Sequence, residues 1–144
     1  MANSLIVPMA AHVALAALLY VLLTIARAPA VWGIGRRPDG SNPWTTYEPR
    51  ISANLSNQFE WPLFFHVACL VLLPMQPGPG VVLLAWGFVA GRVLHSAVQV
   101  GTRNVRLRGV VFTVNFLAVL GPWIAVLMAV ADAGTVARLP DAGP

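Results

Sequence analysis

Four apolar segments, each long enough to cross a lipid bilayer, dominate this chain of 144 residues. They cover about residues 4–26, 49–73, 81–102 and 109–130, and a membrane-spanning helix needs roughly 20 residues. Such segments must be helical, because the bilayer interior offers the backbone no hydrogen-bonding partner. Hydrophobic residues make up 58% of the chain and charged residues 10%, whereas soluble domains carry about 25% charged residues. The sequence therefore predicts an all-α integral membrane four-helix bundle, with a single domain over residues 1–144.

Arginine is the only strongly basic side chain in the sequence, whose formal net charge is +4. The arginines gather in two connections, residues 27–50 and 103–108, on the same side of a four-span bundle, and only Arg138 falls on the other side. By the positive-inside rule both connections are cytoplasmic and both termini lie opposite. Because the arginines flank apolar segments, we expect membrane lipids and small anionic molecules as partners, and no nucleic acid. The lack of Lys and the Ala, Gly, Arg and Val bias favour a bacterial inner membrane.

Polar residues enter the second apolar segment in the stretch N-Q-F-E-W-P. Ionisable groups are rare inside membrane segments and are functional candidates there. Asn57 and Glu60 are three residues apart and share a helix face, and Arg50 lies two turns earlier on nearly the same face, whereas Gln58 points elsewhere. Pro62 lacks an N–H and frees the carbonyl of Gln58, which predicts a hinge.

The third apolar segment carries a basic ridge, since Arg92, His95 and Gln99 are spaced three and four residues apart. Arg106 extends this ridge if the helix continues, whereas Arg108 points elsewhere on an ideal helical wheel. Paired with the ridge of the second segment, it predicts a polar pocket at the cytoplasmic rim of the bundle. In the fourth segment, Pro122 predicts a kink.

Such a pocket suits a small zwitterion with more than one carboxylate and an amine. Guanidinium groups grip carboxylates, and Glu60 would take the ammonium group. An arginine beside a thiol favours the thiolate and lowers the thiol pKa from about 8.5, and the thiolate is the nucleophile. These residues match a peptide thiol such as glutathione that reacts with an electrophile dissolved in the bilayer. The chain's own Cys69 lies in an apolar run and predicts a buried structural thiol, with neither a disulfide nor a metal site.

Two stretches carry a family resemblance, A-N-L-S-N-Q-F-E-W-P-L-F and G-R-V-L-H-S-A-V-Q-V-G-T-R-N-V-R-L-R. They resemble the MAPEG proteins, the membrane-associated proteins in eicosanoid and glutathione metabolism, in their bacterial, microsomal glutathione transferase-like form. Asn57 and Glu60 match the N-x-x-E pattern of that family, and Arg92 and His95 match its R-x-x-[HY] pattern. The resemblance spans about residues 50–125 and implies four transmembrane helices that assemble as a homotrimer, with glutathione between neighbouring subunits near the cytoplasmic side.

The resemblance also implies roles for individual residues. The chain would be a glutathione-dependent transferase or peroxidase that attacks a lipophilic electrophile or lipid hydroperoxide in detoxification. The thiol would be activated by Arg108 or by Arg106, depending on which family member's spacing is followed. The glutathione co-substrate would be bound by Asn57, Glu60, Arg92, His95, Gln99 and Arg50.

Departures from the family pattern keep alternatives open. The family usually has Tyr at the position of Gln99, where it contacts glutathione, and some members have Arg at the position of Ala53. These departures argue against eicosanoid substrates and motivate a second hypothesis, a non-catalytic member that binds a lipid or a partner protein. A third hypothesis, a small proton-coupled exporter built on Glu60, is disfavoured because this residue is near a helix mouth.

Plainer structural roles are also open for some of these polar residues. Glu60 would be an interhelical ion-pair partner of Arg92. His12 and His66 would each make a single polar contact within the bundle.

Overall fold

A computed structural model describes residues 5–136, with side chains described for residues 5–133. Ser4, the expected first residue of the first helix, and Arg138 therefore lie outside the described residues. All regular structure in the described range is helical, and its elements are α1 (Ile6–Trp32), α2 (Glu48–Phe59), α3 (Pro62–Leu72), the short 3₁₀ helix η1 (Leu73–Met75), α4 (Pro79–Gly101), α5 (Val105–Ala118) and α6 (Leu120–Val136).

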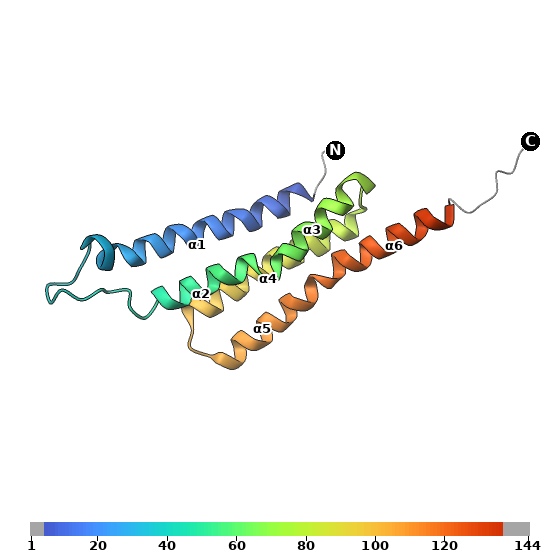
Figure 1. The fold of residues 1–144 in the computed structure, drawn as a ribbon. Helices are drawn as coiled ribbons and strands as arrows, with labels where there is room; N and C mark the ends of the chain where they lie inside the picture. The colour runs from blue at the N-terminus through green and yellow to red at the C-terminus, as the bar shows by residue number, and fades with distance from the viewer. Residues whose placement is uncertain (1–4, 137–144) are drawn as a thin grey trace, which may run out of the picture.

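These helices form four long rods, because α3 continues the direction of α2 and α6 that of α5 (Figure 1). Each rod has the length and apolar composition to cross a membrane, namely Ile6–Trp32, Glu48–Met75, Pro79–Gly101 and Val105–Ala133. The predicted all-α integral membrane four-helix bundle is thus confirmed. The two loops of the predicted arginine-rich connections, residues 33–47 with Arg36 and Arg37 and residues 102–104 with Arg103, lie at the same end of the bundle (Figure 1).

The first helix runs six residues past its predicted end and passes through Pro29 to Trp32. It ends at Gly33, whose φ of 74° is the left-handed conformation that glycine adopts readily at a helix end. Arg36 folds back onto this end: its Nε donates to the carbonyl of Pro29 at 2.6 Å and its Nη2 to that of Ala30 at 3.3 Å. The loop thus supplies donors for carbonyls that have no partner within the helix.

The second rod breaks at the predicted hinge. Helix α2 ends at Phe59, Glu60 leaves the helical region with φ −87° and ψ −101°, and Pro62 opens α3. The side chain between the two helices, Trp61, donates from Nε1 to the carbonyl of Phe116 at 2.9 Å. Its ring also stacks on Phe116 at a centroid distance of 4.2 Å. A contact with α5 therefore holds the break in place.

The fourth rod begins earlier than predicted, at Val105, because Asn104 caps α5 and accepts a hydrogen bond from the Leu107 N–H at 3.0 Å. A three-residue turn separates α4 from α5, so the basic ridge of α4 does not continue into Arg106 as expected. At the predicted kink the helix is interrupted at Val119, close to the carbonyl of Ala118 that the ring of Pro122 would meet, but α6 keeps the direction of α5 (Figure 1).

The apolar core lies where α3, α4 and α6 pack together. Phe65 and Phe88 are fully buried, and their rings stack at a centroid distance of 4.1 Å. Cys69 is buried in the same cluster, as expected. A second cluster, with Leu19, Leu23, Leu55 and others, joins α1 to α2.

A matched pair of glycines tests the close contact between α4 and α5. A Cβ added at Gly91 would lie 2.6 Å from Asn115 Nδ2, whereas one added at Gly87 meets nothing within 4 Å. Asn115 cannot easily move, because its Nδ2 donates to the carbonyl of Phe88 at 3.0 Å. We expect Gly91→Ala to destabilise the protein by about 1–3 kcal/mol and Gly87→Ala to be neutral or stabilising by up to about 1 kcal/mol. Unfolding in detergent measures both, and equal stabilities would contradict this packing.

Candidate functional site

A buried arginine joins three helices in the middle of the bundle. Arg92 of α4 is 2% exposed, and its Nε donates to Gln58 Oε1 at 3.0 Å and its Nη2 to the carbonyl of Asn57 at 2.9 Å. Its Nη1 donates to Asn115 Oδ1 at 3.4 Å. The last carbonyls of a helix lack internal partners and carry partial negative charge. Arg92 therefore stabilises the end of α2 at the break.

Glu60 and Arg92 form no direct ion pair within 4.0 Å, although the carboxylate is near enough to act on the guanidinium electrostatically. Glu60 is exposed at the end of α2. Among residues 5–133 the ion pair within 4.0 Å joins Arg27 to Glu48, at 2.7 Å. The guanidinium of Arg92 uses amide and backbone oxygens in place of a carboxylate.

Gln58, which the helical wheel turned away from the site, is the centre of this polar network. It is 3% exposed, and its Oε1 lies 3.0 Å from Arg92 Nε and 3.0 Å from His12 Nε2. Its Nε2 donates to Asn54 Oδ1 at 3.1 Å and to Ser96 Oγ at 3.2 Å. Both sides of the amide are thus hydrogen-bonded, as a buried amide requires.

A cavity of about 410 Å³ opens between α2, α4 and α5. Polar side chains from all three helices line it, namely Asn57, His95, Gln99 and Arg108. His95 is 1% exposed, and its Nδ1 has no hydrogen-bond partner among the described residues. Since buried polar atoms normally have a partner, this unpartnered nitrogen is an exception, and its residue forms part of the cavity wall.

A second cavity, of about 190 Å³, adjoins the first and shares Gln99 and Arg108 with it. It adds Arg50 and Arg103, so three guanidinium groups line it. Arg50 also donates from Nη1 to the carbonyls of Val100 and Thr102, at 3.4 and 3.3 Å, which fixes it against the end of α4. We call the two cavities together the basic site. Its chemistry suits a ligand with more than one anionic group.

The structure brings together five of the eight predicted site residues at the basic site: Arg50, Asn57, His95, Gln99 and Arg108. Arg92 is buried behind it and contacts the backbone of Asn57. Neither Glu60 nor Arg106 lines either cavity. Arg106 lies in the first turn of α5, because the turn after Gly101 changes the direction of the chain.

The protein family follows from a match to a family model. The model described as the MAPEG family matches residues 5–128, which is most of the chain. This chain belongs to the MAPEG family. A search of curated proteins and a search of solved structures each returned no match. For this MAPEG chain, family membership supports a membrane role in glutathione-related transfer or peroxide reduction, or in eicosanoid metabolism.

The buried amides Asn54 and Gln58 of this MAPEG chain were not predicted as part of the polar network, although their spacing in the sequence could have indicated it. Asn54 is fully buried and donates to Gln99 Oε1 at 2.9 Å. Asn54 and Gln58 are four residues apart and therefore lie on one face of α2. Two amides at this spacing in a membrane segment indicate an interhelical hydrogen-bond network.

Proposed function

We propose that this protein is a glutathione-dependent membrane transferase or peroxidase whose basic site holds the tripeptide. The observation that carries the proposal is the convergence of Arg50, Arg103 and Arg108 on two adjoining cavities, one of which His95 also lines. Two guanidinium groups would bind the two carboxylates of glutathione, and the third would face its thiol. The exposed Glu60 is assigned to the ammonium group of glutathione held against a neighbouring subunit of a homotrimer.

In the proposed reaction Arg108 stabilises the thiolate of glutathione. For a transferase, the sulfur lone pair forms a bond to the electrophilic carbon, and the leaving group departs with its bonding electrons. For a peroxidase, two molecules of glutathione are oxidised to the disulfide, while the hydroperoxide is reduced to an alcohol and water. The apolar outer faces of the helices place the protein in the bilayer. An electrophile dissolved in the bilayer would reach the sulfur from there.

The carboxylates of glutathione provide a test that leaves the protein unchanged. We expect purified protein in detergent to bind glutathione and to turn over a chlorodinitrobenzene electrophile or a lipid hydroperoxide. The diethyl ester of glutathione should bind about 10-fold more weakly or worse, since a hydrogen bond to a charged group contributes about 1.5–3 kcal/mol. Calorimetry measures both affinities. Failure of the folded protein to bind glutathione, or equal affinity for the ester, would overturn the proposal.

One observation favours the second candidate function, a non-catalytic member that binds a lipid. Gln99 occupies the position of the family's tyrosine, and its Oε1 already accepts hydrogen bonds from Asn54 and Asn57, at 2.9 and 3.3 Å. That oxygen is therefore used within the protein. Under this alternative a lipid would co-purify in the basic site, glutathione would not displace it, and both substrates would remain unconverted.

A further inference from the structure

A separate cavity of about 400 Å³ lies between α1 and the break that joins α2 to α3. Its walls are mainly apolar, with Ala16 and Ala17 contributed by α1 and Phe59 and Leu63 by the second rod. None of the arginines of the basic site lines it. Its chemistry is therefore set by the four polar side chains in its wall, namely His12, Tyr20, Gln58 and His66.

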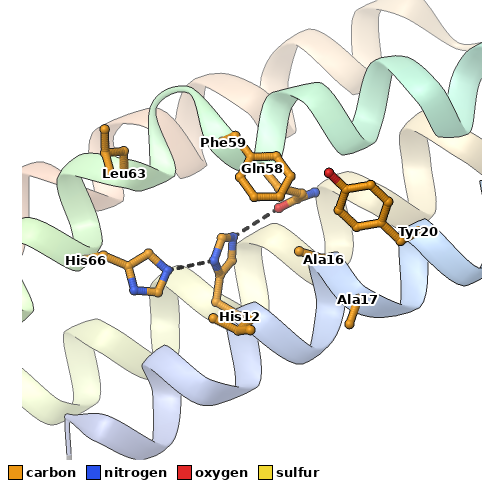
Figure 2. A pocket seen from close by; sticks show the side chains of 9 residues that line it. His12, Ala16, Ala17, Tyr20, Gln58, Phe59, Leu63 and His66 are labelled. Carbon is orange, nitrogen blue, oxygen red and sulfur yellow. Dashed lines mark hydrogen bonds between the residues drawn. The ribbon is translucent and has the colours of Figure 1, made fainter.

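Three of these side chains form one hydrogen-bonded row (Figure 2). His66 Nε2 lies 3.0 Å from His12 Nδ1, and His12 Nε2 lies 3.0 Å from Gln58 Oε1. The two histidines, expected from the sequence to make separate single contacts, are thus partners of each other. Among residues 5–133 no group of three His, Cys, Asp or Glu side chains gathers around a point that could hold a metal ion.

This row uses its polar atoms within the protein. Arg92 Nε can only donate, so the atom of Gln58 that faces it is the carbonyl oxygen. That oxygen can only accept, so His12 carries its proton on Nε2, and with both imidazoles neutral its Nδ1 accepts from His66 Nε2. The remaining nitrogen of His66 lies on the side of the ring away from Phe59 (Figure 2). A ligand in the cavity therefore has to find its hydrogen-bond partner elsewhere in the wall.

Tyr20 is the polar side chain that the row leaves out. Among residues 5–133 its hydroxyl forms no hydrogen bond, and Figure 2 shows this hydroxyl pointing toward Phe59 and Gln58. Tyr20 lies near the middle of α1, about 20 Å from either end at about 1.5 Å per residue, whereas the bilayer interior is about 30 Å thick. A hydroxyl without a partner is unfavourable in such an apolar medium, so a molecule that enters the cavity and bonds this hydroxyl is stabilised there.

We propose that this cavity binds a lipophilic carbonyl compound, whose oxygen accepts a hydrogen bond from the hydroxyl of Tyr20. A phenolic hydroxyl can both donate and accept, but it is the stronger donor because its oxygen shares electron density with the ring. The apolar body of the ligand lies between the alanines of α1 and the ring of Phe59. The volume of the cavity is within the range of about 300–1,000 Å³ that small-molecule sites occupy. A hydrocarbon of the same shape has no acceptor and is bound less well.

A pair of probes that differ only in the acceptor tests the ligand class. The protein in lipid nanodiscs is titrated with para-hexylacetophenone and with the alkene in which a methylene group replaces the carbonyl oxygen. Tyr20 and Tyr47 are the two tyrosines of the chain, so a ¹³C label at Cζ reports on each hydroxyl separately by NMR. At equal concentration in the lipid, we expect the ketone to bind about three- to tenfold more tightly, as one hydrogen bond provides. The ketone should shift the Cζ resonance of Tyr20 and leave that of Tyr47 unchanged.

Tyr20→Phe removes the hydroxyl and keeps the ring, and Tyr47→Phe makes the same change outside the cavity. In Tyr20→Phe, followed at the imidazole nitrogens of His12, the two probes should bind equally, whereas Tyr47→Phe should keep the preference for the ketone. Equal binding by the unchanged protein would overturn the proposal, as would a preference that survives in Tyr20→Phe. If neither probe binds, lipid or a second copy of the chain fills the cavity and the proposal is wrong.

A second pair of variants tests the cavity without altering its polar side chains. Ala17 lines the cavity and Ala14 does not, and both are exposed residues of α1. Ala17→Phe should abolish the resonance shifts with both probes, and Ala14→Phe should leave them unchanged. If Ala17→Phe retains ketone binding, the ligand lies elsewhere and the proposal fails. None of these residues lines the basic site, so glutathione binding should be the same in all variants, and this result is independent of the proposed function.

Discussion

Replacing Arg92 by methionine is expected to destabilise the protein by about 2–6 kcal/mol, since each of two buried acceptors that loses its donor costs about 1–3 kcal/mol. Methionine has a similar length but no donor, so Asn115 Oδ1 and the carbonyl of Asn57 lose the guanidinium. Part of this destabilisation is offset, because the variant no longer has to transfer a charged guanidinium from water into the protein interior. Unfolding in detergent, followed by circular dichroism, measures the difference.

The control for this substitution is Arg37→Met, which makes the same chemical change at an exposed position of the first loop. We expect it to change stability by no more than about 0.5 kcal/mol. Arg92→Lys should fall between the two, because an ammonium group cannot reach all three acceptors on α2 and α5. If Arg92→Met were as stable as Arg37→Met, the hydrogen bonds of the buried guanidinium would contribute nothing to the fold.

Replacing Arg108 by alanine is expected to lower kcat/KM for glutathione transfer by about 10²–10³-fold, the usual effect of removing one group that stabilises a developing negative charge. Arg108 lines both cavities of the basic site, whereas Arg106 lines neither. Arg106→Ala removes a charge outside the cavities, so kcat/KM should stay within about threefold of the unchanged protein. The ultraviolet absorbance of the bound thiolate should disappear in Arg108→Ala and persist in Arg106→Ala.

The two variants separate the two sequence-based assignments of the activating arginine. Both arginines are exposed, so neither substitution should change the unfolding midpoint. A loss of activity would then result from weaker stabilisation of the glutathione thiolate and not from unfolding. A large loss in Arg106→Ala, with Arg108→Ala unaffected, would move the activating role to Arg106 and contradict our assignment.

The four spans could be predicted from the sequence because each is a long apolar run that nothing else in the chain resembles. Their ends could not, because they depend on contacts outside the run. The extension of α1 through Pro29 relies on hydrogen bonds from Arg36, which is seven residues further along the chain. The start of α5 did have a local signal, since Asn104 is a favourable N-cap residue. The three neighbouring arginines led us to predict a turn there instead.

The residues that line the cavities were predicted in part, and the use of a helical wheel explains some of the differences. A helical wheel assumes an unbroken helix, but the second rod breaks at Glu60 and the third ends at Gly101. The wheel therefore favoured Arg106 over Arg108, although Arg106 lines neither cavity. Within single helices it succeeded, since His95 and Gln99 line the same cavity. The central role of Gln58 depends on His12 of another helix, which no single-helix pattern contains.

The amide of Gln58 also interrupts proton transfer between the side chains on either side of it. A continuous row of imidazoles could pass protons by exchanging donors and acceptors along its length. Gln58 interrupts such a path, because an amide oxygen accepts a hydrogen bond but has no proton to hand on, and the guanidinium beyond it does not release one. These hydrogen bonds therefore offer protons no continuous path from His12 to Arg92, although both side chains are buried within the bundle.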